Sequence, residues 1–547
     1  MVSVPLAGAL ADRWFARRNH LPTPGRYTIA TVRIPMRDGV ELGADLYTPR
    51  GSSRGLVLIR GPYGRDPVMA MPAARLFAGQ GYTVLFASSR GTADSGGVFD
   101  PMRDEVRDGQ DTVTWMRRQP WYPGRFGTVG GSYLGYTQWA MLSRPPVDLA
   151  AAVVVMGPHD FARHTWDTGA ARLDVIGWAE LIATQASARN PLAMILAQAT
   201  APRRLRPILS ATPTVPAADR HFATTAPWVH ERLTRPDLAD PFWARMQHAD
   251  ALERATCPVL VLAGWQDIFL AQSVEQYTRL AERGVDVALT VGAWAHADIT
   301  FGAQRVMAPE SLAWLDTHLA HARPGARATP VHVEVTGTDA WVRLPAWPPA
   351  SDARTLHLAP GGRLTAHAPG SGVAGASFTY DPADPTPTVG GNLLGDGGYA
   401  DDSALAARAD VLAYDGDRLP ADLTVMGVPS VRLVHASDLP DADLFVRVSE
   451  VDGAGRSRNV SEGYVRVGAR DGAGSATVDL ELLPVAHTFR AGHRVRLLVA
   501  GGSFPQFSRN PGTGENPLTA ARLARNRHTV VHADGGSALT LPVTAAA

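Results

Sequence analysis

Three residues that could do acyl-transfer chemistry each follow an apolar segment: Ser132, Asp267 and His296. Ser132 lies in FGTVGGSYLG (126–135), a pattern that predicts a buried strand, a sharp turn and a helix start. Asp267 follows VLVLAGW, and His296 follows VALTVGAW. Side chains at the carboxyl ends of parallel strands gather at one edge of a sheet. We therefore predict a triad in which His296 takes the proton of Ser132 and Asp267 orients the imidazole.

Each member of this predicted triad has a simpler alternative. Asp267 could cap the helix that follows it. His296 could be an ordinary loop histidine, since the chain has 17. Two further histidines, His159 and His164, with Asp160 between them, follow another apolar run, but they stand too early in the chain for the order Ser, Asp, His.

A serine nucleophile also needs hydrogen-bond donors for the negative charge that develops on the carbonyl oxygen. One predicted donor is the backbone N–H of Tyr133, the residue after the serine. The segment after an earlier strand, RGPYGR (60–65), has no run of glycine donors but offers the hydroxyl of Tyr63. The alternative is that Tyr63 is a packing aromatic.

Composition excludes several other functions. The chain has formal net charge zero and contains no lysine, which argues against nucleic-acid or membrane partners and excludes Schiff-base, P-loop and Ser–Lys chemistry. The one cysteine, Cys257, precedes an apolar strand and allows neither an internal disulfide nor a cysteine metal cluster. We expect a cytoplasmic enzyme, monomeric or homodimeric, that acts on a small molecule and needs no metal or organic cofactor.

Strand and helix patterns alternate early in the chain, with one helix expected over 70–79, stop near residue 157, and resume near residue 251. Such alternation predicts a parallel sheet covered on both faces. The interruption has helical spacing and several prolines, and short alternating segments follow a HARPGARATP linker. The predicted class is α/β with a helical cap and an all-β jelly-roll sandwich. The predicted boundaries are 1–158 and 251–325 for the core, 159–250 for the cap and 326–547 for the sandwich.

Several segments together resemble the cocaine esterase-like serine hydrolases, a group related to X-prolyl dipeptidyl aminopeptidases and α-amino-acid ester hydrolases. The matching segments are IPMRDGVELGADLYTP, RGPYGR, SRGTADSGG, GRFGTVGGSYLG, GWQDIF, VGAWAH, DPADPTPTVGGNLL, DADLFVRVSEV and FPQFSRNPGTGENP. The resemblance implies an α/β-hydrolase core, the G-x-S-Y-x-G form of the serine turn, and a tyrosine hydroxyl in the oxyanion hole. One departure is Ser88, where relatives usually carry aspartate.

The resemblance also implies substrate-binding positions at Trp166, Trp178, Phe269 and Leu394, although each could be an ordinary core residue. Relatives that bind a substrate ammonium place carboxylates just after the catalytic aspartate, where this chain has Phe269 and Leu270. An ammonium against apolar side chains would lose hydration without replacement. We therefore expect an ester, with some amides possible, that has an apolar or aromatic acyl group. The alternatives are an X-prolyl dipeptidyl aminopeptidase or amino-acyl hydrolase and, more remotely, a non-catalytic binding protein.

Overall fold

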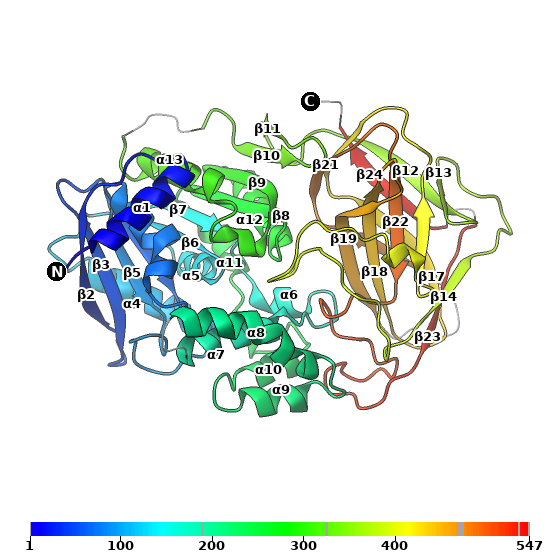
Figure 1. The fold of residues 1–547 in the computed structure, drawn as a ribbon, viewed down its shortest axis with the longest axis horizontal. Coiled ribbons are helices and arrows are strands. Elements are labelled where there is room, and N and C mark those ends of the chain that lie inside the picture. Colours follow the sequence, from blue (N-terminus) through cyan, green and yellow to red (C-terminus); the bar gives the residue numbers. More distant parts are fainter. Residues whose placement is uncertain (1, 188–190, 323–326, 469–474, 534–535, 545–547) are drawn as a thin grey trace.

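A computed structural model describes residues 2–187, 191–322, 327–468, 475–533 and 536–544. An α/β region, a helical cap and a β-rich region lie side by side, with the cap below the other two in the view of Figure 1. The predicted fold class is confirmed: strands alternate with helices in the first region, and strands dominate the last. Residues 323–326 of the predicted linker lie outside the described residues.

The α/β region is built on one twisted sheet, whose order is β1-β2-β3-β5-β4-β6-β7-β8-β9-β10-β11. Neighbours from β5 to β10 pair in parallel, and the strands at both edges pair antiparallel. The strands are β1 (Val2–Ser3), β2 (Tyr27–Pro35), β3 (Glu41–Pro49), β4 (Leu56–Gly61), β5 (Thr83–Ser88), β6 (Phe126–Gly131), β7 (Leu149–Val155), β8 (Val259–Gln266), β9 (Val287–Ala295), β10 (Val331–Val335) and β11 (Ala340–Leu344).

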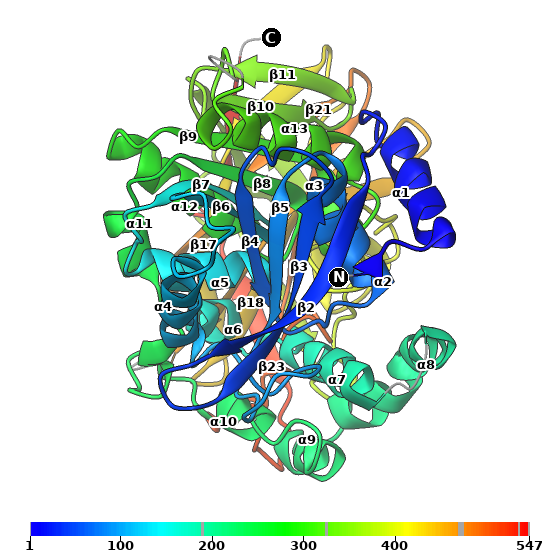
Figure 2. The ribbon, with the colours of Figure 1, turned by 90° about the vertical axis from the view of Figure 1, so that its left-hand side faces the viewer.

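Helices cover both faces of this sheet, as the side view in Figure 2 shows. One face packs against α4 (Glu105–Met116), α5 (Tyr133–Leu142), α11 (Ala249–Arg254) and α12 (Leu270–Glu282). The other face packs against α1 (Leu6–Arg18), α2 (Pro67–Ala70), α3 (Leu76–Gly79) and α13 (Gln304–His318). No helix in the described part of the chain is long and apolar enough to cross a membrane.

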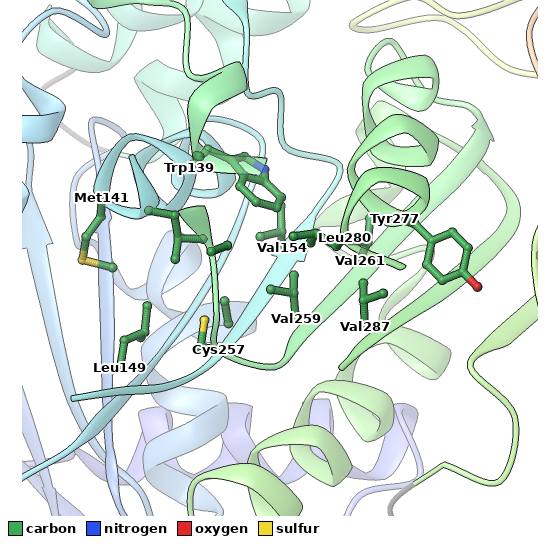
Figure 3. Packing of buried hydrophobic residues seen from close by; sticks show 14 of the residues in the cluster. Trp139, Met141, Leu149, Val154, Cys257, Val259, Val261, Tyr277, Leu280 and Val287 are labelled. Carbon is green, nitrogen blue, oxygen red and sulfur yellow. The ribbon is translucent and has the colours of Figure 1, made fainter. Parts of the chain in front are cut away.

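The close view in Figure 3 shows the first of these cores, where Val259 and Val261 of β8 meet Val154 and Trp139. Cys257 is buried at the entrance to β8, and burial raises the pKa of its thiol to about 12. A thiol with such a pKa stays protonated at neutral pH and is a poor nucleophile. Its position agrees with the predicted strand-entry role.

The segment from 70 to 79, predicted as one helix, is broken. It passes through α2, a π-type stretch (Met71–Arg75) and α3, and Ala73 has non-helical dihedrals (φ −110°, ψ −105°). The cause is Pro72, which cannot donate a backbone hydrogen bond and crowds the preceding turn. The prediction of a single continuous helix was wrong here.

The cap is inserted between β7 and β8, as the sequence pattern predicted. Its helices pack with the start of α5 in one apolar cluster, so the cap lies over the serine turn. The helices are α6 (Phe161–Trp166), α7 (Asp174–Ser187), α8 (Pro191–Leu209), α9 (Val215–Phe222) and α10 (Val229–Thr234).

The β-rich region forms a second, mostly antiparallel sheet system around its own core. Its strands are β12 (Asp352–Ala359), β13 (Arg363–Thr365), β14 (Ala376–Tyr380), β15 (Val411–Asp415), β16 (Leu423–Gly427), β17 (Ser430–Ser437), β18 (Ala442–Val451), β19 (Ser457–Val467), β20 (Ala476–Glu481), β21 (Val485–Phe489), β22 (Arg494–Ala500), β23 (Asn526–Val530) and β24 (Ala538–Val543).

The expected boundary at residue 326 does not match the division between the two sheets. Strands β10 and β11 were assigned to the sandwich, but β10 pairs in parallel with β9 and extends the first sheet. The alternation of buried and half-buried residues in β10 suits an outer strand of either sheet. Local pattern alone could not decide which sheet it joins.

Candidate active site

The turn between β6 and α5 places Ser132 in a strained conformation at the edge of the sheet. Its φ of 55° and ψ of −124° are unusual for a residue with a side chain. The Ser132 N–H donates to the carbonyl of Val155 on the neighbouring strand at 2.9 Å, which fixes the turn. Backbone strain of this kind persists only where the surrounding structure holds it, and it often occurs at functional sites.

Glycines beside the serine are required by close packing. A Cβ on Gly131 would lie 2.2 Å from Ile299, and one on Gly130 would lie 2.4 Å from Leu134. A Cβ on Gly135 would lie 2.8 Å from the Cα of Gly157, which is a backbone contact that cannot move aside. The turn therefore accepts Leu134 at the position after Tyr133 but requires glycine one residue later.

The structure brings Ser132, His296 and Asp267 together from three strand ends. His296 Nε2 lies 2.9 Å from Ser132 Oγ, and His296 Nδ1 lies 2.6 Å from Asp267 Oδ1. Asp267 is fully buried and His296 is nearly so. The other carboxylate oxygen of Asp267 accepts the N–H of Phe269 at 3.0 Å. This chain can deliver the serine proton to the imidazole and stabilise the resulting cation.

The other polar residues near the end of β7 are engaged elsewhere. His159 is buried, which lowers its pKa to about 3, and the backbone N–H groups of His159 and Asp160 both donate to Gln272. Asp160 caps α6 by accepting the N–H of Arg163 at 3.0 Å. His164 hydrogen-bonds to Asp174 and not to the serine.

Three hydrogen-bond donors lie beside Ser132: the Tyr63 hydroxyl, the Trp178 indole and the Tyr133 backbone amide. The hydroxyl of Tyr63 lies 3.5 Å from Ser132 Oγ, and the indole N–H of Trp178 donates to the Tyr63 oxygen at 3.2 Å. The backbone N–H of Tyr133, at the start of α5, also donates to the Tyr63 oxygen. Burial raises the pKa of Tyr63, so its hydroxyl stays protonated and available to donate. The amino-terminal end of α5 adds partial positive charge at the same point.

The side chain of Tyr133 is fixed from behind. Its hydroxyl donates to Glu105 at 3.0 Å and accepts the N–H of Met102 at 2.6 Å. Glu105 is buried and paired with Arg60 at 2.7 Å. The Tyr133 ring stacks on Trp178, with centroids 5.8 Å apart and planes 14° apart. These contacts hold the first turn of α5 and the pocket wall in one arrangement.

A pocket opens beside these groups, with an empty volume of about 370 Å³ including its mouth. Three of the four residues expected there, Trp178, Phe269 and Leu394, do line it. Trp166 does not, which corrects that expectation. It is buried inside the cap, and its indole N–H donates to the carbonyl of Arg232 at 2.9 Å. The remaining lining residues are Tyr63, Met102, Ser132, Tyr133, Pro158, Phe161, His164, Asp174, Val175 and Ile268.

Asp174 and His164 are pocket residues that sequence reasoning did not assign. His164 Nε2 lies 2.9 Å from Asp174 Oδ2, and the His164 ring packs 4.6 Å from the ring of Phe269. Asp174 stands four residues before Trp178, so both project from the same face of α7. The four-residue spacing can be read from the sequence. Its meaning could not, because only the structure shows that α7 lies over the serine.

The β-rich region closes one side of the pocket through the loop that carries Leu394. The carbonyl oxygen of Asn392, two residues earlier in this loop, accepts a hydrogen bond from the Arg172 guanidinium at 2.7 Å. Asn459 of β19 accepts a hydrogen bond from the backbone N–H of Ala400 in the same loop. Its side-chain NH2 group donates to Gln266, the neighbour of Asp267, at 3.0 Å. The pocket is thus built from the core, the cap and the β-rich region together.

Ser88 stands where relatives usually carry an aspartate, and it contacts a basic partner through its hydroxyl. Its hydroxyl accepts a hydrogen bond from Arg65, two residues after Tyr63. Arg65 is balanced by Asp94 at 2.7 Å and Asp45 at 3.2 Å. Two neighbouring acids therefore supply the negative charge that an aspartate at 88 would bring. Within the described residues, no three His, Cys, Asp or Glu side chains are placed to share a metal ion.

Comparisons with known proteins agree with this architecture. Residues 38–298 match the family model of X-Pro dipeptidyl-peptidase (S15 family), and residues 325–541 match the model of the X-Pro dipeptidyl-peptidase C-terminal non-catalytic domain. The chain is 30% identical to cocaine esterase from Rhodococcus sp. (strain MB1 Bresler), over 90% of this chain and 93% of the relative.

Two solved structures share the fold. An α-amino acid ester hydrolase has a TM-score of 0.81 at 23% identity, covering 95% of this chain and 97% of that one. An aminopeptidase from a marine sediment archaeon, Thaumarchaeota archaeon, has a TM-score of 0.80 at 22% identity, covering 95% and 96%. The chain therefore belongs to the cocaine esterase-like serine hydrolases, with an S15-type X-Pro dipeptidyl-peptidase region followed by the corresponding C-terminal domain.

Proposed function

We propose that this enzyme hydrolyses carboxylic esters through an acyl-enzyme formed on Ser132. The observation that carries the proposal is the unbroken hydrogen-bond chain from Ser132 Oγ through His296 to buried Asp267. Ser132 Oγ attacks the ester carbonyl while His296 Nε2 takes its proton. The proton then passes to the leaving alcohol, and the same imidazole activates the water that releases the acid.

The charge on the tetrahedral oxygen is held by the Tyr63 hydroxyl and the Tyr133 N–H. Trp178 donates into the Tyr63 oxygen. This bond orients the phenol and polarises its O–H, because hydrogen bonds in a chain strengthen one another. In this proposal Trp178 is a positioning residue for the oxyanion hole and at the same time a wall of the acyl pocket.

The acyl group occupies the space bounded by Trp178, Phe269 and Leu394, which favours an apolar or aromatic group of modest size. A small-molecule ester is therefore the proposed substrate, with amides as slower substrates. An amino-acyl substrate is less well supported, because Phe269 and Leu270 offer no carboxylate to an ammonium. The two similar solved structures carry names of amino-acyl enzymes, so X-Pro anilides and amino-acyl esters belong in the substrate panel.

The proposal is tested with Ser132→Ala and a fluorophosphonate probe. We expect the wild-type protein to be labelled once, at Ser132, and the variant to lose p-nitrophenyl acetate hydrolysis while unfolding at the same temperature. Turnover that survived in a folded Ser132→Ala protein would refute the nucleophile. An unlabelled but folded wild-type protein would favour a non-catalytic role.

A further inference from the structure

One charged group in the acyl pocket has no part in the proposed chemistry. The Asp174 side chain is 10% exposed and lines a pocket whose other walls are mostly apolar. Burying a carboxylate costs free energy unless it is paired. Asp174 meets that cost through His164 at 2.9 Å and Arg172 at 3.4 Å.

Both hydrogen-bond donors to Asp174 contact the same carboxylate oxygen. His164 Nε2 and Arg172 Nε each reach Oδ2, and among the described residues no hydrogen bond is recorded for Oδ1. A carboxylate oxygen has lone pairs for two hydrogen bonds. The pocket therefore contains an acceptor held in place by its neighbours and open to a ligand.

The charge balance around Asp174 restricts the ligand. Burial would raise the pKa of Asp174, but its neighbours His164 and Arg172 outweigh burial, lower that pKa and keep the carboxylate ionised. Burial lowers the pKa of His164, which leaves its imidazole neutral. Asp174 and Arg172 thus already form a neutral pair, and a ligand ammonium would add an unbalanced buried positive charge.

The position of Asp174 restricts where the donor lies on the substrate. Trp178 marks the oxyanion end of the pocket, because its indole binds the Tyr63 hydroxyl. Asp174 is one helical turn away on the same face of α7, or about 6 Å along the helix axis. An aromatic ring with a substituent at its far side fits within that spacing.

We propose that Asp174 is a specificity subsite that accepts a hydrogen bond from a neutral hydroxyl at the far end of the acyl group. The favoured substrates are then esters of hydroxyaryl acids, and Arg172 and His164 position the acceptor. This inference rests on the proposed ester hydrolysis at Ser132 and names its substrate class. A site built to receive a hydrogen bond discriminates against analogues without the donor, because its polar group is left unpaired.

The test uses p-nitrophenyl esters of phenylacetic acid that carry hydroxyl, methyl or aminomethyl at ring position 3 or 4. We expect the wild-type enzyme to prefer one hydroxyl isomer over its methyl counterpart by about tenfold or more in kcat/KM, and the aminomethyl ester to be poor. Asp174→Leu, which has a similar shape and no hydrogen-bonding group, should bring the hydroxyl-to-methyl ratio close to one. The unsubstituted ester reports on hydrolysis itself, so loss of the ratio is distinct from failure of the proposed function.

Glu180 supplies a matched control on the same helix. It is also bound by an arginine and a histidine, Arg204 and His221, but it does not line the pocket. Glu180→Leu should leave the ratio unchanged. Three results would overturn the subsite: no hydroxyl preference in the wild-type enzyme, a hydroxyl preference retained in Asp174→Leu, or an aminomethyl ester that is hydrolysed faster than the hydroxyl ester. The first and third results are measured on the wild-type enzyme, so they test the subsite even if Asp174→Leu fails to fold.

Discussion

Two buried His–Asp pairs contact the same aromatic ring in this molecule. The Phe269 ring is 5.4 Å from His296, which binds Asp267, and 4.6 Å from His164, which binds Asp174. The residue types are the same in both pairs. What differs is the ring nitrogen that each aspartate holds.

Asp267 binds Nδ1 of His296, which leaves Nε2 free to face Ser132. Asp174 binds Nε2 of His164, and within the described residues no hydrogen bond joins the His164 imidazole to Ser132. The first pair can act as a base, whereas the second forms part of a pocket wall. A His–Asp pair therefore acquires a catalytic role from the imidazole nitrogen that it leaves free and from the group that this nitrogen faces.

The largest difference should appear on removing each histidine. We expect His296→Ala to lower kcat for p-nitrophenyl acetate by at least about 10⁴-fold, since the general base is lost. His164→Gln keeps a hydrogen-bond donor for Asp174 and should change kcat by less than about tenfold. Steady-state kinetics on both proteins checks this, and an equal loss in the two would erase the distinction between the pairs.

The aspartates should differ in the same direction by a smaller amount. Asp267→Asn presents an amide to Nδ1 and favours the wrong tautomer, so a loss of about 10³- to 10⁴-fold in kcat is expected. Asp174→Asn should cost less than about tenfold on an acetate ester, which does not reach that wall. Comparable losses on acetate would mean that Asp174 acts on the triad.

The oxyanion donors allow a test between direct and indirect action. Tyr63→Phe should lower kcat by about 10²-fold or more with little change in KM. Trp178→Phe should cost about tenfold, and this cost should vanish in the Tyr63→Phe background, because the indole acts through the phenol. A double-mutant cycle with an acetyl ester, whose small acyl group makes little contact with the indole, measures the coupling. Additive losses would leave Trp178 as a pocket wall alone.

A third buried acid, Asp160, should have the smallest effect on catalysis and should act on stability instead. Burial raises its pKa to about 6, so between about pH 4 and pH 6 the folded protein holds a proton that the unfolded chain has released. Stability from this group is therefore lost as pH rises through that window. Asp160→Asn keeps the cap of α6 and lacks the charge. Relative to wild type, the free energy of unfolding of this variant should rise by about 2 to 3 kcal/mol between pH 4 and pH 7.

Urea denaturation at several pH values would measure this gain. The matching change at a paired acid, Glu180→Gln, should have the opposite sign, because Arg204 and His221 hold the pKa of Glu180 below its usual range. A pH-independent offset for Asp160→Asn would mean that its carboxylate is ionised in the folded protein as easily as in the unfolded chain.

Much of the fold could be predicted because its signals are local. Apolar runs of strand length alternate with amphipathic segments, which predicts a covered parallel sheet, and the cap interrupts that alternation visibly. One exception arose where the deciding contact lies elsewhere in the chain: strand β10 joins the first sheet because β9 offers it an edge. The other exception is local, because the helix before residue 79 breaks at Pro72.

The pocket was less predictable than the serine turn. Trp166 and Trp178 are both cap tryptophans, and their sequence surroundings do not separate them. Trp166 binds a carbonyl inside the cap, and Trp178 binds the Tyr63 hydroxyl. The difference comes from how α6 and α7 pack over α5, which no local pattern encodes.

By itself the sequence determined the residue types available for chemistry: one serine on a glycine-bound turn, an aspartate and a histidine at later strand ends, and no lysine. Those features follow from short-range rules of chain geometry, under which the carboxyl ends of parallel strands must meet. Only the tertiary structure decided which nitrogen each histidine leaves free and which carboxylate faces the substrate. Such choices depend on contacts between separate segments, including the one between Ser132 and His296, which are 164 residues apart, and burial and charge pairing are properties of the packed whole.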